Sequence, residues 1–175
     1  MSRFERMPRD LYRTPPDTAA LLARHLPAEY RFIAPCAGDG GFVQTLEAHG
    51  HHCAYAADIE PLAEGITRAD GAQIPAEYDG LPVIENPPFS RTLFRRLMLS
   101  WLEQGREVWA LMPLGYLANE WTWKAGLPQR CHEVLMLPRV QWFANEAGMK
   151  ETRDHVFALF KPEDSSAAAL RRVMA

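Results

Sequence analysis

The sequence is poor in cysteine, and it has neither a long apolar run nor a signal-like beginning. Its three cysteines, Cys36, Cys53 and Cys131, are widely spaced, which excludes a disulfide framework and suits a reducing cytoplasm. No run of about 18 apolar residues is present, so no membrane span is predicted. Residues 1–13 are too polar for a secretory signal. We therefore expect a cytoplasmic protein that does not associate with membranes.

An excess of positive charge is also missing. The chain has 19 Lys and Arg against 22 Asp and Glu, for a net charge of −3, so an overall positive field cannot attract nucleic acid to it. Any such ligand must be bound by a local basic patch. Two groups of arginines are candidates, and a solvated surface is the alternative for both: Arg3, Arg6, Arg9 and Arg13 near the start, then Arg91, Arg95 and Arg96.

Short apolar runs alternate with helical segments, which is typical of an α/β fold with a mostly parallel sheet and helices on both faces. The 175 residues fit one domain. Strands are predicted at 30–35, 51–59, 81–86, 107–113, 132–138 and 155–160, with Asp70 closing a further strand. Helices are predicted at 14–27 (with Thr14 as the N-cap), 42–50, 61–68 and 92–105. No helix separates the last two strands, so they are expected to form an antiparallel pair at an edge.

Three weak signals follow one another at the carboxyl ends of the predicted strands, where such sheets bind ligands. Gly38, Gly40 and Gly41 lie between a strand and a helix and allow a ligand to approach the backbone closely. Asp58 lies 18 residues after Gly40, near the spacing at which a carboxylate meets a ribose hydroxyl pair. Asp70 ends the next strand. Taken singly, the glycines fit a tight turn, Asp58 a helix cap and Asp70 an Asp-Gly turn.

The stretch "ENPPFS", residues 85–90, ends another predicted strand. Its two consecutive prolines, Pro87 and Pro88, fix two φ angles and remove two backbone donors. Each proline also pushes the residue before it toward extended geometry. Asn86 is therefore held on a stiff turn, and Phe89 follows with a flat apolar face. A strand end closed by prolines is the alternative interpretation.

Together, "APCAGDGGF", "AADIEP", "RADGAQ" and "ENPPFS" resemble, in this order, motifs I to IV of the class I S-adenosylmethionine-dependent methyltransferases. The Asn-Pro-Pro-Phe form is similar to that of the amino-methyltransferases, above all the DNA adenine-N6 enzymes. "LYRTPPDTAALL" resembles their motif X. The resemblance covers roughly residues 10–161. It implies a Rossmann-like methyltransferase fold, with a seven-stranded, mostly parallel sheet, an antiparallel edge strand and helices on both faces.

The resemblance also implies roles for particular residues, with S-adenosylmethionine as the cofactor and no metal. The cofactor would be bound by Tyr12, Thr14, Pro15, Pro35, Ala37, Gly38, Gly40, Asp58, Ile59, Asp70 and Asn86. The catalytic residues would be Asn86, Pro87 and Phe89, with the Asn86 side-chain oxygen and the Pro87 carbonyl accepting the two N–H groups of the target amine. The substrate would contact Pro88, Phe89, Arg139, Trp142 and Phe143.

Two features depart from the family pattern. Ala34 stands where motif I usually carries an acid, and only about 15 residues follow Phe160, where a target-recognition domain normally begins. The resemblance therefore implies a DNA adenine-N6 methyltransferase of bacteria or their viruses that lacks its own recognition domain. We expect it to act on single-stranded DNA or with low sequence specificity, as a homodimer or beside a specificity subunit. Methylation of an RNA base or a protein glutamine, and a degenerate nucleic-acid-binding subunit, stay open as alternatives.

Overall fold

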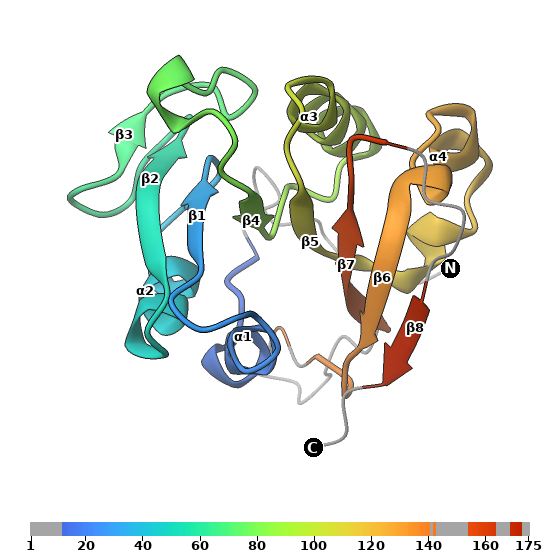
Figure 1. Ribbon diagram of the computed structural model, residues 1–175, viewed down its shortest axis with the longest axis horizontal. Coiled ribbons are helices and arrows are strands. Elements are labelled where there is room, and N and C mark those ends of the chain that lie inside the picture. The colour runs from blue at the N-terminus through green and yellow to red at the C-terminus, as the bar shows by residue number, and fades with distance from the viewer. Residues whose placement is uncertain (1–11, 141, 143–153, 164–168, 173–175) are drawn as a thin grey trace, which may run out of the picture.

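The computed structural model describes residues 12–140, 142, 154–163 and 169–172. Its strands form one sheet in the order β3-β2-β1-β4-β5-β7-β6-β8 (Figure 1). The strands are β1 (Arg31–Ala34), β2 (His52–Asp58), β3 (Thr67–Arg68), β4 (Val83–Glu85), β5 (Val108–Pro113), β6 (Cys131–Met136), β7 (His155–Phe160) and β8 (Ala169–Arg172). The predicted α/β fold is confirmed.

The sheet is parallel apart from β7, which is antiparallel to both of its neighbours, β5 and β6. The predicted antiparallel pairing of the last two sequence-predicted strands is therefore confirmed. The sheet has one strand more than predicted, since β8 lies beyond β6 and β7 lies between β5 and β6. Every residue of β7 is buried. A strand that is apolar on both faces, as "HVFALF" is, belongs in the middle of a sheet.

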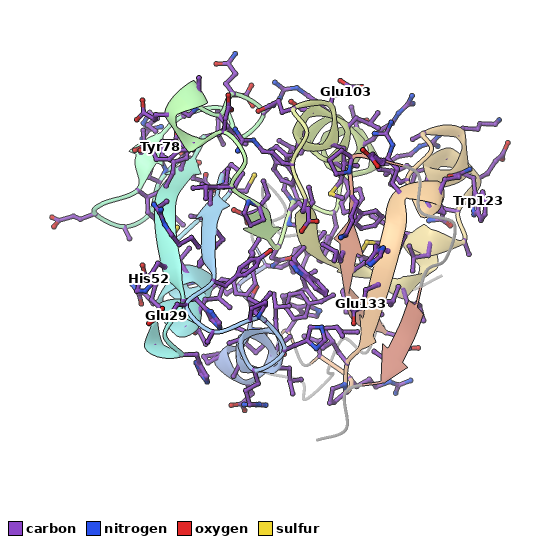
Figure 2. The ribbon with its side chains drawn as sticks, viewed as in Figure 1. Glu29, His52, Tyr78, Glu103, Trp123 and Glu133 are labelled. Atoms are coloured by element: carbon purple, nitrogen blue, oxygen red, sulfur yellow. The ribbon has the colours of Figure 1, made fainter. Side chains whose placement is uncertain are left out.

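Helices cover both faces of the sheet, as predicted. Figure 1 shows α1 (Pro16–Ala23) and α2 (Gly41–Ala48) at the bottom, and α3 (Arg91–Glu103) and α4 (Glu120–Lys124) at the top. One buried apolar cluster contains residues of α1 and α2, and a second contains residues of α3. Side chains fill the space beside the sheet in Figure 2, whereas Glu103 and Trp123 lie at the periphery and are exposed.

The longest helix, α3, forms because its apolar residues recur on one face. Phe94, Leu97, Met98, Trp101 and Leu102 are buried there, whereas Leu93, which was also placed on this face by the sequence pattern, is 41% exposed. The hydroxyl oxygen of Ser90 accepts a hydrogen bond from the backbone N–H of Leu93 and so caps the first turn. This cap fixes where the chain leaves the Asn-Pro-Pro-Phe stretch and enters the helix.

Two local predictions were wrong. No helix forms over residues 61–68, because Gly65 adopts a φ of +79° and Thr67–Arg68 pair with β2 as the strand β3. The N-cap of α1 is Pro15 rather than Thr14. The Pro15 carbonyl accepts from the backbone N–H groups of Thr18 and Ala19, so the helix begins one residue later than the sequence suggested. In the described part of the chain, no helix has the length and apolar character needed to span a membrane.

Candidate functional site

The glycine loop after β1 is bound by three hydrogen bonds to the end of β2 and to the segment that follows β2. The Gly38 N–H donates to Asp58 Oδ2 over 2.9 Å, the Ala37 N–H donates to the Ala57 carbonyl, and the Leu62 N–H donates to the Gly38 carbonyl. Gly38 has a φ of +58°, a conformation that glycine adopts without strain. The loop and the end of β2 therefore form one rigid ledge at the carboxyl edge of the sheet.

Asp58 holds this ledge with both carboxylate oxygens, since Oδ1 accepts from the Glu60 N–H over 2.8 Å. It is not the helix cap that was considered as an alternative, because no helix follows it. Each carboxylate oxygen has two lone pairs, so both can accept a further bond from a ligand hydroxyl. Ile59 beside it is 66% exposed and offers an apolar surface to a planar ring. This pairing fits the predicted ribose and adenine contacts.

Asp70 makes contacts that the sequence did not predict. Its Oδ2 is paired with Arg96 of α3, and its Oδ1 accepts from the Ala72 N–H over 3.0 Å. The hydrogen bond from Arg96 is the main reason that its pKa lies below the ordinary value. Asp70 therefore joins the loop after β3 to α3, and its binding of the cofactor amino group stays a prediction.

Gly71, which the sequence reasoning missed, lets that same loop pass against the end of β1. A Cβ at this position would lie 2.6 Å from the Pro35 carbonyl oxygen and 2.9 Å from Cys36 Sγ, closer than atoms can pack. The Gly71 carbonyl accepts from the Trp101 indole N–H over 2.7 Å, which fixes the loop from the other side. The only sequence signal was the Asp-Gly pair itself.

We expect Gly71→Ala to destabilise the protein by roughly 1–3 kcal/mol, because the new methyl group must push the Pro35 backbone away. Thermal unfolding should show a fall of about 2–4 °C for each kcal/mol. Gly115→Ala is the matched control, since a Cβ there meets nothing within 4 Å. Equal melting temperatures for the two variants would contradict the close approach.

Glu85, the last residue of β4, carries a buried carboxylate between the glycine loop and the Asn-Pro-Pro-Phe stretch. Its side chain is 2% exposed, Oε1 accepts from the Cys36 N–H over 2.6 Å, and Oε2 accepts from the Asn86 N–H over 3.1 Å. Burial, with a smaller effect from the charge of Asp58, raises its pKa to about 8. Sequence reasoning missed this residue, although a charge inside the apolar run "LPVIEN" was the signal.

Ala34 was noted because an acid was expected there. It is 1% exposed and packs in the apolar cluster of α1 and α2. The buried acid beside the glycine loop is therefore Glu85, supplied by β4 rather than by β1.

The raised pKa of Glu85 predicts a pH-dependent stability. The folded pKa of about 8 lies above the ordinary 4.5, so Glu85 favours folding below about pH 4.5, and this contribution is lost as the pH rises through 8. Relative to Glu85→Gln, the wild type should lose up to roughly 4 kcal/mol between pH 5 and pH 9. Denaturant unfolding across this range measures the difference, with the exposed Glu103→Gln as the control. A difference that does not vary with pH would exclude the effect.

Asn86 is held by the N-terminal segment of the described chain. Its Nδ2 donates to the Tyr12 carbonyl over 2.6 Å, which orients the amide. Its Oδ1 is buried and has no hydrogen-bond partner within the described residues. Leaving a buried acceptor unpaired costs roughly 1–3 kcal/mol, so an atom of this kind needs an explanation. A ligand N–H group would satisfy it.

An aromatic cluster surrounds Phe89 and joins several of the predicted residues. The rings of Tyr12 and Phe89 are stacked, with centroids 5.6 Å apart and planes at 23°. Trp142 meets both rings edge-on, and its indole N–H donates to Nδ1 of His155. The His155 ring centroid lies 5.5 Å from that of Phe89. His155 was not predicted as a site residue, because its strand reads as continuous core.

The remaining predicted residues lie around these groups. Pro35, Gly38, Gly40 and Pro87 are buried, whereas Thr14, Pro15, Ala37 and Pro88 are half-buried. Arg139 is exposed and forms a 3.7 Å ion pair with Asp154, next to His155 in sequence. Phe143 lies outside the described residues.

The predicted basic patches are only partly formed. Arg3, Arg6 and Arg9 lie outside the described residues, and Arg13 pairs with Asp39 of the glycine loop over 2.8 Å. On α3, Arg96 forms an ion pair with Asp70, and Arg91 lies over the ring of Trp121. Arg95 is exposed.

This strand order, with the site at the carboxyl ends of β1, β2 and β4, is the Rossmann-like methyltransferase fold. A Listeria monocytogenes protein assigned to the class I S-adenosylmethionine-dependent methyltransferases superposes with a TM-score of 0.67 at 13% identity, covering 95% of this chain and 67% of that one. A type I restriction-modification methyltransferase subunit from Streptococcus thermophilus gives 0.61 at 14%, covering 92% and 47%. A protein assigned as an RNA methyltransferase from Pyrococcus horikoshii gives 0.61 at 15%, covering 86% and 87%.

At sequence identities of 13–15%, these similarities show a shared fold and nothing more. The chain spans about two thirds of the Listeria protein and just under half of the Streptococcus subunit. No protein-family model matches the sequence, and no curated protein is similar to it in sequence.

Proposed function

We propose that this protein is an S-adenosylmethionine-dependent methyltransferase that modifies the exocyclic amino group of adenine in DNA. The observation that carries the proposal is the buried Oδ1 of Asn86, which has no hydrogen-bond partner among the described residues and lies directly after β4, beside the glycine loop. An amine N–H is the group that this acceptor lacks. The methyltransferase fold supports the proposal, as does the restriction-modification system to which one structural neighbour, the Streptococcus subunit, is assigned.

The residues at the ledge fit the cofactor. Asp58 has acceptor capacity for ribose hydroxyls, Ile59 exposes an apolar face, and the backbone at Gly38 has no side chain to obstruct a ligand. When bound, S-adenosylmethionine supplies an activated methyl group on a sulfonium. Tyr12, Thr14, Pro15, Pro35, Ala37, Gly40 and Asp70 would complete the pocket, as the resemblance implies.

In the proposed reaction the protein's own groups mainly orient the amine. Asn86 Oδ1 and the Pro87 carbonyl would accept its two N–H groups, so that the nitrogen lone pair is free to point at the methyl group. Because the methyl group is already activated, the rate would come from orientation and electrostatic placement rather than from a strong base. Phe89 would stack on the base, which must first leave a duplex if it is paired.

The cluster around Phe89 sets a condition on this stacking. Tyr12 already lies parallel to the Phe89 ring. A base that stacks on that face must therefore take the place of the Tyr12 ring, while Trp142 and His155 stay against Phe89.

The proposed nucleic acid is DNA that is single-stranded or read with little sequence preference, with a second copy of the chain or a separate subunit supplying specificity where it is needed. Incubation with methyl-labelled S-adenosylmethionine, followed by nucleoside mass spectrometry, tests this on matched single-stranded DNA, duplex DNA, RNA and protein. We expect N6-methyladenine in DNA, formed fastest on single strands. Binding should weaken steeply with salt, because phosphate contacts dominate it.

Each other outcome of that experiment identifies a different function. Label in RNA or in glutamine side chains would change the substrate class. No label in any polymer, with cofactor binding intact, would favour a non-catalytic subunit. Methylation confined to one long sequence by the isolated chain would overturn the expected low specificity.

A further inference from the structure

Glu85 is a buried acid that the proposed transfer chemistry does not use. One carboxylate oxygen accepts from Cys36 of the glycine loop, and the other accepts from Asn86. Cys36 and Glu85 are 49 residues apart in the chain. One side chain thereby joins the segment that would bind the cofactor to the residue that would bind the target amine.

Among the described residues, the charged and titratable groups around Glu85 include no cation. Asp58, from the end of β2, adds negative charge. The thiols of Cys36 and Cys53 have pKa values raised by burial, well above the ordinary value for Cys36 and to about 12 for Cys53, so they stay neutral. Asp70 lies near Cys36 but is paired with Arg96.

The described helix and strand that follow β4 in the sequence, α3 and β5, add no counter-ion to this list. In register with Glu85, β5 places Ala110, and the buried face of α3 is apolar. No basic side chain in the described part of the chain forms an ion pair with Glu85. Since the described residues supply no such cation, we look for it in a bound ligand.

We propose that Glu85 is a positioning residue: its ionised carboxylate clamps the glycine loop to Asn86, and the positive charge of a bound cofactor stabilises that ionised form. This inference rests on the proposed function for the identity of the cofactor. Binding of S-adenosylmethionine would then tighten the support of Asn86 before the methyl group moves. The product, S-adenosylhomocysteine, has no sulfonium charge, so the clamp would relax after transfer.

The chemistry of the carboxyl group explains how the ionised and the protonated states of Glu85 differ. An ionised carboxylate accepts strongly at both oxygens, and charge-assisted bonds to N–H groups are about twice as strong as neutral ones. Protonation turns one oxygen into a hydroxyl, which weakens one of the two bonds. Because a nearby opposite charge favours the ionised form, a cationic ligand and an intact clamp stabilise each other.

NMR of the full chain tests the inference through the backbone amide signals of Cys36 and Asn86. In the free protein, both signals should shift together in a single titration between pH 6 and pH 10. Saturating S-adenosylmethionine should lower the proton affinity of the titrating group about tenfold or more, that is, by at least about one pH unit. S-adenosylhomocysteine should change it less than about twofold. Glu85→Gln should abolish the titration of both signals.

Three results would overturn the inference: separate midpoints for the two amides, equal shifts with both ligands, or a titration that persists in Glu85→Gln. The first two use only the wild-type protein, so they decide the matter even if the variant does not fold. The Gly38 amide, beside Asp58, distinguishes the two proposals. If neither ligand shifts the Gly38 amide signal, the proposed cofactor is wrong. The proposed link between the cofactor charge and the ionisation of Glu85 is then wrong as well.

Discussion

Asn86→Ala should leave cofactor binding nearly intact and reduce turnover by about 10²- to 10³-fold, the usual effect of removing one oriented polar contact at a reaction centre. The variant loses the buried Oδ1 that has no partner within the described chain. Removing an unsatisfied acceptor offsets the loss of the Tyr12 bond, so the melting temperature should change little. Single-turnover rates beside thermal melts measure both effects.

Asn86→Asp is the informative companion variant, because it keeps an acceptor in the same place while losing the donor to Tyr12. We expect partial activity from it. Asn119→Ala controls for the general cost of the substitution, since its side chain makes no capping bond at the start of α4. If Asn86→Ala were folded and fully active, the target would not be an amine bound at Asn86. A purely structural turn would instead give lower stability with unchanged activity per folded molecule.

Asp58→Ala should weaken S-adenosylmethionine binding by roughly 1.5–3 kcal/mol, or about 10- to 150-fold in Kd. Two effects add in the same direction. The proposed bonds to the ribose hydroxyls are lost, and the Gly38 N–H loses its acceptor, so the loop is no longer fixed. Calorimetric titration of the cofactor measures the change directly.

Asp58→Asn separates these two effects, because it retains one acceptor oxygen for the Gly38 N–H while losing the charge. Its affinity should lie between those of the wild type and Asp58→Ala. Asp39→Asn, in the same loop, is the control for the loss of a nearby carboxylate that pairs with Arg13 instead. Unchanged affinity in Asp58→Ala would remove Asp58 from the cofactor site.

The sequence predicted the parts of this molecule that depend on local patterns. Apolar runs that alternate with helical segments identify the strands β1, β2, β4, β5, β6 and β7. The buried face of α3 follows from the helical spacing of its apolar residues. The position of the Asn-Pro-Pro-Phe stretch directly after a strand was also predicted, although the structure has no regular turn at residues 86–90. What local patterns could not give is which side chain of one segment meets which backbone of another. Glu85 reaching Cys36 is a contact of this kind.

The same limit explains the other differences. The ligand role of Asp70 stays a prediction, but its ion pair with Arg96, from a helix that begins 21 residues later, could not be predicted from the neighbours of Asp70. The stacking of Tyr12 on Phe89 likewise brings together two segments that are far apart in the sequence. The sequence neighbours of neither residue indicate this contact. By contrast, the absence of the predicted helix at residues 61–68 has a local cause, the positive φ of Gly65. The pattern of "PLAEGITR" had indicated a helix in spite of this glycine.

The position of β7 has a consequence for how the chain acquires its fold. During synthesis β5 and β6 emerge before β7, yet β7 must lie between them. Until residues 155–160 are made, β5 is paired on one side only, through β4, and its other edge displays unpaired backbone groups and apolar side chains. Such edges recruit foreign strands. Completion of the sheet is therefore a late, long-range event of high contact order, and a nascent chain stalled before His155 is most vulnerable to aggregation along β5.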